Sequence, residues 1–262
     1  LMITAWRTHT STGISKELIA NELNYNIYHK QSYINLYGAV QKMVDKKAIE
    51  DFTIFKNGYE KLIKPQERLQ DDEIVSQVDK IKPIAEYCGE RGIPFVYLTS
   101  ILPVQDEDDL PYEDIDYQNI NADRLLEEIK GSNIPYYDLR SNETIMSIPK
   151  EELFYRTDHH WTARTCFTVW QELIKSWNET YDIEVDESLL DPNNYDTMVW
   201  EDSFLGSYGV KVGEYYDGRD DFVVYSPLFD TDFSFESYDN EGNMILTEGL
   251  VLQEEKYWTE FL

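Results

Sequence analysis

Two helix-turn-strand units, one after the other, constrain the fold of this 262-residue chain more than any other feature of its sequence. The first has apolar residues at helical spacing over residues 71–91, then a glycine and the run IPFVYL at residues 93–98. The second repeats this order with residues 121–130 and the run IPYYDL at residues 134–139. Strands that are joined through helices lie parallel in one sheet. The sequence therefore predicts an α/β fold with a parallel sheet, and the run at residues 93–98 is apolar enough to be covered on both faces.

The rest of the chain divides into segments around these units. Residues 1–50 have a partly amphipathic helical pattern and form a predicted N-terminal helical extension, while residues 51–262 form the α/β domain. Asn57 and a following glycine lie between two short apolar runs, which predicts a hairpin. Within the domain, residues 178–262 are predicted to be an insertion of loops, one short strand and a two-stranded β-ribbon.

The charge of the chain excludes one large class of partners. Its 51 acidic residues outnumber 23 basic ones, for a net charge of −28, and nucleic-acid phosphates require clustered lysine and arginine. We therefore expect no nucleic-acid partner. No run approaches the roughly 20 apolar residues of a membrane-spanning helix, and no signal peptide is recognisable, although a chain that opens on Leu1 leaves room for a preceding targeting segment. Cys88 and Cys166 are expected to be buried free thiols.

The candidate functional residues lie together in the tetrapeptide Asp-His-His-Trp at residues 158–161, which holds two of the chain's four histidines. If residues 156–161 are extended after a strand that ends at Tyr155, side chains two apart share a face at about 6.5 Å. The carboxylate of Asp158 then reaches one imidazole nitrogen of His160 and leaves the other free. This is an orienting acid with a general base, two thirds of a Ser-His-Asp arrangement.

A helix is predicted to follow the tetrapeptide directly. Apolar residues recur at three- and four-residue steps over residues 163–177, and Thr162 is the expected N-cap. The pair of acid and base then lies at a strand-to-helix junction, where α/β folds commonly keep their chemistry. Arg156 and Trp161 flank the pair and are candidates for substrate binding, although both could equally be structural.

Two other interpretations of the tetrapeptide stay open. Adjacent histidines also occur on surface loops without a function, and Trp161 could serve only in packing. Aspartate and histidine are metal ligands as well, but no other histidine lies nearby in sequence and no His-x3-His or cysteine pair supports a site. We place catalytic orientation ahead of a structural role and predict neither a metal nor a cofactor.

With this tetrapeptide, the preceding Phe-Tyr-Arg-Thr at residues 154–157 and the hairpin near Asn57, the chain resembles the DHHW-motif protein family from about Asn24 onward. That family is related to the alginate O-acetyltransferase accessory proteins, whose fold is SGNH-hydrolase-like. The resemblance implies a three-layer parallel sheet, incomplete at the C-terminus of this chain. It also implies that Asp158 and His160 supply the acid and base of a triad, and it gives His159 no role.

The resemblance further implies a serine nucleophile in a Gly-Asp-Ser motif, located after the Asp-x-His in the chain. The nearest match is Glu-Asp-Ser ending at Ser203, where glutamate replaces the glycine that permits the tight turn. Ser207 belongs to a segment that resembles a structural part of the family. We therefore predict that neither serine is the nucleophile, so that it lies beyond Leu262 or is lacking in this member.

The function implied by the resemblance is that of an extracytoplasmic carbohydrate O-acetyltransferase, at the cell envelope or outside the cell. Its partners would be a polysaccharide or cell-wall glycan and a membrane-bound acyltransferase that supplies acetyl groups. Two alternatives use the same fold. One is a non-catalytic carbohydrate-binding or scaffolding subunit of a polysaccharide-acetylation system, and the other is an SGNH-type acetylesterase that transfers the acyl group to water.

Overall fold

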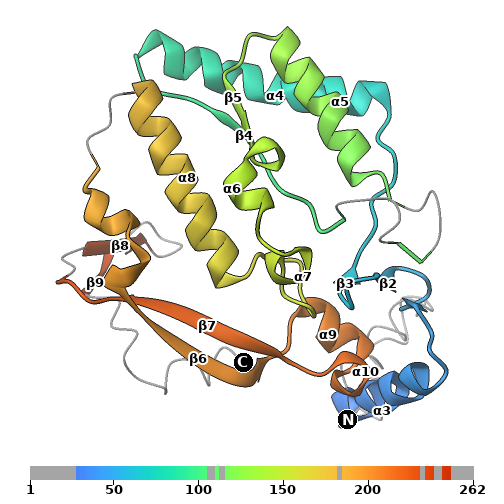
Figure 1. The fold of residues 1–262 in the computed structure, drawn as a ribbon. Coiled ribbons are helices and arrows are strands. Elements are labelled where there is room, and N and C mark those ends of the chain that lie inside the picture. Colours follow the sequence, from blue (N-terminus) through green and yellow to red (C-terminus); the bar gives the residue numbers. More distant parts are fainter. Residues whose placement is uncertain are drawn as a thin grey trace, which may run out of the picture.

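The computed structural model describes residues 28–104, 110–111, 116–181, 185–230, 234–238 and 244–248. It is a mixed structure of helices and several small sheets, in which β4 and β5 lie among helices and the β6–β7 ribbon lies along one edge (Figure 1). Residues 1–27, where part of the predicted N-terminal extension falls, lie outside the described ranges. Among the described helices, none combines the length and the apolar run that crossing a bilayer requires.

The two predicted helix-strand units are present. Helix α4 (Asp71–Glu90) leads to strand β4 (Tyr97–Thr99), and helix α5 (Gln118–Gly131) leads to strand β5 (Tyr136–Asp138). The two strands pair in parallel, with Tyr97 opposite Tyr136, which confirms the predicted pairing. Both strands are shorter than expected, and the described part of the sheet to which they belong has these two strands alone.

The prediction that the first strand is covered on both faces is wrong for the described residues, and the second strand is also partly exposed. Tyr97 packs with α4 and α5, and Tyr137 packs with the core on the other side of the pair. However, Leu98 is 39% exposed and Tyr136 is 44% exposed. The described helices therefore cover the pair only in part.

Helix α4 contains Pro83 and is one continuous helix of 20 residues. A proline removes one backbone hydrogen bond and crowds the preceding turn, and Pro83 lies on the exposed side of the helix. A capping box stabilises the other end, where the Gln70 N–H donates to the Glu73 carboxylate at 2.7 Å. The helix therefore continues through the proline.

The main core lies between β5 and helix α8 (Ala163–Tyr181), and it includes the short elements η2 (Leu139–Ser141), α6 (Glu143–Met146) and α7 (Lys150–Leu153). Leu139 and Ile145 are fully buried there, and Val169 of α8 packs against the same cluster. Thr162 caps α8 as predicted, because its hydroxyl accepts a hydrogen bond from the Thr165 N–H at 3.3 Å.

A three-stranded antiparallel sheet forms around the predicted hairpin, in the order β1 (Ala48–Ile49), β2 (Ile54–Lys56) and β3 (Leu62–Ile63). The side chain of Asn57 stabilises the turn by accepting the N–H groups of Tyr59 and Lys61 at 3.0 and 2.9 Å. The Leu62 N–H donates to the Arg156 carbonyl at 2.9 Å. The hairpin thus supports the segment that carries the histidines.

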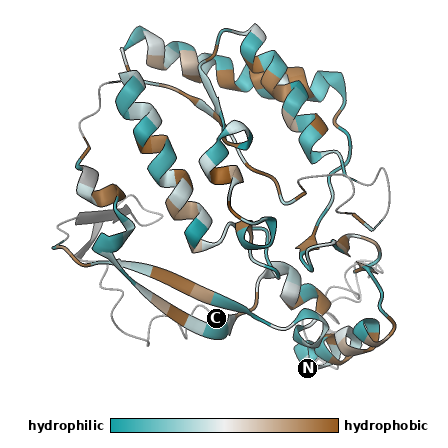
Figure 2. Ribbon diagram, in the orientation of Figure 1, coloured by the Kyte–Doolittle hydropathy of each residue, from teal (hydrophilic) through white to brown (hydrophobic). Residues whose placement is uncertain are grey.

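The C-terminal third is more regular than its sequence indicates. Strand β6 (Tyr195–Phe204), in a region predicted to be mainly loop, pairs antiparallel with β7 (Asp220–Pro227). Figure 2 shows hydrophobic residues along the middle of both strands. Helices α9 (Ser207–Val212) and α10 (Glu214–Asp217) connect β6 to β7. The 3₁₀ helices η3 (Glu187–Leu190) and η4 (Pro192–Asn194) precede β6. The predicted β-ribbon is confirmed as β8 (Ser234–Tyr238) paired with β9 (Met244–Glu248).

Helix α3 (Lys30–Met43), from the N-terminal segment, docks on the connection between β6 and β7. Gly38 makes this approach possible, since a Cβ there would lie 2.5 Å from the Val212 carbonyl oxygen.

The expected burial of the two thiols is wrong: Cys88 is half-buried and Cys166 is exposed, and both are free.

Candidate functional site

The segment that carries the tetrapeptide is a reversing loop rather than the extended strand that was predicted. Helix α7 ends at Leu153, and an isolated antiparallel bridge pairs Phe154 with Trp161. The Tyr155 N–H donates to the His160 carbonyl at 3.1 Å, which closes the loop. Residues 156–160 are bends within it. The strand expected to end at Tyr155 is therefore replaced by a short helix and a loop.

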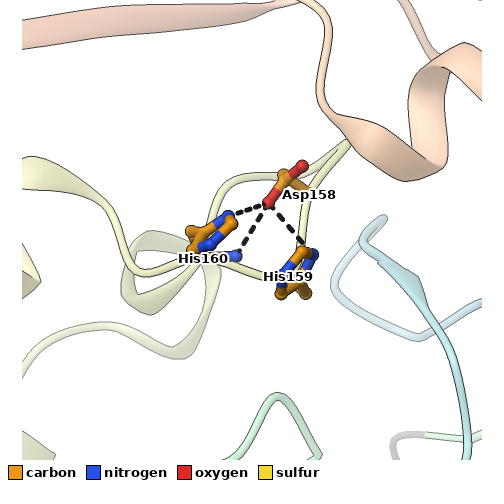
Figure 3. A group of neighbouring side chains, drawn as sticks. All are labelled: Asp158, His159 and His160. Carbon is orange, nitrogen blue, oxygen red and sulfur yellow. Dashed lines mark hydrogen bonds and ion pairs between the residues drawn. The ribbon is translucent and has the colours of Figure 1, made fainter. Parts of the chain in front are cut away.

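Asp158 and His160 meet inside this loop (Figure 3). The Asp158 Oδ1 atom lies 2.5 Å from His160 Nδ1 and also accepts the His160 backbone N–H at 3.0 Å. The carboxylate thus turns back onto its own loop, in the way aspartate does at turns. The contact between acid and base forms through a turn, not through the alternation of a strand.

The other carboxylate oxygen of Asp158 is held from a distant part of the chain. Its Oδ2 accepts the Ser207 N–H at 2.5 Å, at the first residue of α9. The preceding Gly206 lies so close that an added Cβ would stand 2.3 Å from the Asp158 Cβ. No other residue leaves room for this approach without a shift of the loop.

Asp220, the first residue of β7, fixes the backbone immediately before Asp158. Its Oδ1 accepts the Arg156 N–H at 2.8 Å, and its Oδ2 accepts both the N–H and the hydroxyl of Thr157, at 2.9 and 2.6 Å. The Thr157 hydroxyl in turn accepts the Gly206 N–H at 2.9 Å. The Thr157 side chain and the N–H groups of Arg156 and Thr157 therefore all have partners, which supports the backbone beneath Asp158.

Burial and hydrogen bonding act in opposite directions on Asp158. Burial disfavours the charged carboxylate, but the N–H of Ser207 and the donors of His160 outweigh it, and the pKa of Asp158 is lowered. The Asp158 side chain is 4% exposed, whereas that of His160 is 69% exposed. A buried carboxylate therefore holds an imidazole that faces solvent.

His159 is the second histidine at this carboxylate. Its Nδ1 lies 3.3 Å from Asp158 Oδ1 and 3.2 Å from the Ser207 hydroxyl, and its ring centre lies 4.0 Å from that of His160. One ligand-type atom from each of Asp158, His159 and His160 falls within 4.8 Å of the others. Sequence spacing gave no metal motif because the loop, and not a helix or a repeat, gathers these atoms.

A cleft of about 440 Å³ opens in front of the two imidazoles. Trp161 lines it, as a substrate-binding role requires, and Ser100 reaches it from the C-terminal end of β4. Its remaining lining residues are Lys64, Gln66, Ile101, Leu102, Pro103, Gln118, Phe154, His159, His160, Cys166 and Tyr208.

Arg156 is not among the residues that line the cleft. Its guanidinium donates to the Arg219 carbonyl at 2.5 Å and lies 3.4 Å from the buried carboxylate of Asp217. Lys56 binds the same carboxylate at 2.6 Å, so on this side of the loop two cations, Lys56 and the partly exposed Arg156, share one buried carboxylate. The placement of Arg156 favours a structural role.

The two serines considered from the sequence occupy different places. Ser203 lies in β6 and donates to the Trp200 carbonyl at 2.9 Å. Ser207 touches the site, but its hydroxyl faces His159 Nδ1 and its N–H is committed to Asp158. Within the described part of the chain, the His160 Nε2 atom has no hydrogen-bond partner.

Sequence reasoning missed Gly206, Ser207 and Asp220 as parts of the site. They lie 49 to 64 positions from the residues they hold. The only local signal is the short glycine-containing run at residues 205–209, which a single sequence does not connect to the tetrapeptide.

Neither protein-family models nor curated proteins match this chain, but solved structures do. PatB1 of Bacillus cereus matches with a TM-score of 0.59 at 16% sequence identity, over 74% of this chain and 65% of the PatB1 chain. The structure of PatB1 with a sulfonyl adduct matches with a TM-score of 0.61 at 16% identity, over 76% of this chain and 65% of the PatB1 chain. The O-acetyltransferase domain of Pseudomonas putida AlgJ matches with a TM-score of 0.53 at 13% identity, over 67% of this chain and 66% of the AlgJ chain. A DHHW family protein of Eubacterium siraeum gives 0.38, too low for the folds to be called alike.

This chain therefore has a fold similar to those of PatB1 and the AlgJ domain, and it spans 65% of the length of the PatB1 chain. The predicted relation to the alginate O-acetyltransferase proteins is confirmed at the level of the fold.

Proposed function

We propose that this protein is an extracytoplasmic carbohydrate O-acetyltransferase in which Asp158 and His160 serve as the acid and base of a Ser-His-Asp triad. One observation carries the proposal: His160 Nδ1 lies 2.5 Å from a buried carboxylate, and Nε2, beside a cleft, has no partner among the residues that the structure describes. A general base needs this combination of fixed orientation and a free nitrogen. The likeness of the fold to the O-acetyltransferase domain of AlgJ supports the same class of protein.

The chemistry follows from the two ends of the imidazole. Asp158 holds His160 in the tautomer that carries its proton on Nδ1 and stabilises the positive charge that forms later. The free Nε2 takes the proton of a serine hydroxyl, the serine oxygen attacks the acetyl donor, and an acetyl-enzyme forms as His160 gives that proton to the leaving group of the donor. His160 then takes the proton of a sugar hydroxyl, whose oxygen attacks the acetyl group, and returns this proton to the serine oxygen as the ester bond to the serine breaks.

Among the described residues no serine hydroxyl contacts His160, so the nucleophilic serine is itself proposed. Ser203 and Ser207 are engaged elsewhere, and the Ser100 hydroxyl in the cleft donates to the Ile101 carbonyl at 2.8 Å, so the proposal has a further segment bring a hydroxyl to His160 Nε2. We propose that this segment extends the β4–β5 pair into the three-layer, SGNH-hydrolase-like sheet. Backbone N–H groups beside the serine would hold the oxyanion.

The cleft suits a saccharide acceptor. Trp161 and Tyr208 offer aromatic faces, on which the apolar faces of sugar rings pack, while Lys64 and Gln66 offer donors for hydroxyl groups. We propose a polysaccharide or cell-wall glycan as the acceptor and a membrane-bound acyltransferase as the source of acetyl groups. Both place the protein at the cell envelope or outside the cell.

A non-catalytic glycan-binding subunit is the second candidate. It is favoured by the absence of a serine hydroxyl against His160 within the described residues. An acetylesterase is the third, since it differs only in passing the acetyl group to water.

Hydrolysis and transfer of an activated acetyl ester by the full chain, with and without an oligosaccharide acceptor, distinguish the three. We expect turnover that rises with the acceptor and falls about 100- to 10,000-fold in His160→Ala, with little change in melting temperature because His160 is exposed. His29→Asn, at an exposed histidine with φ of 56°, is the matched control.

The outcomes separate cleanly. Turnover that ignores the acceptor identifies the esterase. Glycan binding without turnover, and without labelling of any serine by a sulfonyl fluoride in mass spectrometry, identifies the binding subunit. Turnover that is equal in His160→Ala and in the wild type rules out the dyad.

A further inference from the structure

We propose that Asp158, His159 and His160 also form a chelating site for a divalent transition-metal ion such as Zn²⁺, and that the bound ion switches the dyad off. The binding half of this inference stands on the geometry of the loop, and only the inhibitory half rests on the proposed function. It gives His159 a role that the family resemblance does not.

The donors are those that zinc prefers. Two imidazole nitrogens and one carboxylate oxygen lie within 4.8 Å of one another (Figure 3). In a tetrahedral site with ligands at about 2.0–2.1 Å, neighbouring donor atoms are about 3.3 Å apart. Asp158 Oδ1 and His159 Nδ1 are already 3.3 Å apart. The 2.5 Å contact from the same oxygen to His160 Nδ1 would open to admit the ion.

The loop is also anchored and accessible in the manner of a metal site. The Ser207 N–H holds Asp158 Oδ2, which leaves Oδ1 as the donor and fixes its direction. The side chains of His159 and His160 are 51% and 69% exposed, so an ion enters from the cleft and water completes its coordination. Three protein ligands and one open position are the pattern of zinc sites that exchange ligands.

The negative net charge of the protein favours cation binding, and the types of ligand determine which cation binds. A net charge of −28 concentrates cations around the protein, although Lys64 in the same cleft opposes them locally. Two imidazoles with one carboxylate suit zinc, nickel and copper, whereas magnesium and calcium require oxygen ligands.

Metal and catalysis would exclude each other because they use the same atoms. The ion takes the Nδ1 lone pair of His160 and the Oδ1 of Asp158, and the Nδ1 proton leaves to solvent. His160 then loses the carboxylate that orients it. Zn²⁺ is thus expected to inhibit acyl transfer reversibly.

Titration of the tag-free, chelator-washed full chain with ZnCl₂ by calorimetry tests the binding half. We expect one Zn²⁺ per chain, with affinity reduced about 10- to 100-fold in His159→Ala and unchanged in His29→Asn, an exposed histidine far from the loop in sequence. Equal affinity in His159→Ala and the wild type, or no binding at all by the wild type, overturns the site.

Ester hydrolysis tests the inhibitory half as a ratio of rates with and without Zn²⁺. We expect Zn²⁺ to lower the rate of the wild type at least tenfold and a chelator to restore it. At the same Zn²⁺ concentration, the rate of His159→Ala should fall by a smaller factor. Acceleration by Zn²⁺, or equal inhibition of both proteins, overturns the switch. If the wild type shows no hydrolysis, the proposed function fails while calorimetry still decides the site.

Discussion

The loop that carries Asp158 and His160 has two sides that differ sharply. On one side Thr157 is fully buried and Asp158 nearly so, and hydrogen bonds with Gly206, Ser207 and Asp220 hold their side chains. On the other side the two imidazoles face a cleft and are more than half exposed. The carboxylate is fixed by the fold and the imidazoles are left to meet another molecule.

This contrast indicates where stability and function reside. A buried donor that loses its partner costs about 1–3 kcal/mol, so the anchored side is sensitive to single changes. Truncating an exposed side chain usually changes the free energy of unfolding by less than about 0.5 kcal/mol. Substitutions on the anchored side should therefore act through stability, and those on the open side through binding or rate.

Asp220→Ala should have the largest effect on stability. It removes the acceptor of three hydrogen bonds from Arg156 and Thr157, and we expect the free energy of unfolding to fall by about 3 kcal/mol. Denaturant unfolding measures this. Asp221→Ala is the control, at an exposed neighbour that accepts a single N–H, and should cost less than about 1 kcal/mol. Equal losses in the two variants would erase the contrast.

Gly206→Ala should follow, with a loss of about 2 kcal/mol. The new methyl group would lie 2.3 Å from the Asp158 Cβ and 2.5 Å from the Thr157 carbonyl oxygen, so the two segments must separate. Gly89→Ala in α4 is the matched control, because no atom lies within 4 Å of the added Cβ and alanine favours a helix. A melting temperature that is unchanged in Gly206→Ala would show that the anchored side is not tightly packed.

Lys61 gives a smaller, pH-dependent effect. Burial lowers the pKa of Lys61 to about 8 from its usual 10.5. Between pH 8 and about 10 the unfolded chain therefore binds more protons than the folded one, and the free energy of unfolding should rise with pH, by roughly 2 kcal/mol from this group. Above pH 10 the raised pKa of Tyr155, about 12 because of burial, acts in the opposite direction.

The measurement is the free energy of unfolding at pH 8 and pH 10 in the wild type and in Lys61→Met, which should lose the rise. Lys56→Met is the control. Burial alone lowers the pKa of Lys56, but hydrogen bonds to Asp217 and Glu60 raise it overall, so its contribution is lost only at higher pH. A rise that persists in Lys61→Met would assign the effect to another group.

The sequence predicts those parts of the molecule whose causes are local. Periodicity and turn residues suffice for the β4–β5 pair and for the hairpin at Asn57, and two-residue spacing suffices for the contact of Asp158 with His160. Even there the geometry differs, since a turn makes the contact that an extended strand was expected to make.

The remainder depends on contacts between distant segments, which a single sequence does not reveal. Strand β6 alternates poorly and carries acids such as Asp196 and Glu201, yet pairing with β7 makes it a ten-residue strand. Arg156, expected at the cleft, turns instead to Asp217, 61 positions away in the sequence.

The bond from Ser207 to Asp158 closes a loop of 49 residues, and those from Asp220 close longer ones. Such closures carry an entropic cost and tend to form late in folding. A chain with α8 complete but β6 and β7 undocked would have its histidines without their oriented aspartate. The protein is thus expected to hold Asp158 rigidly beneath His160, as the proposed function requires, only once β6 and β7 have docked.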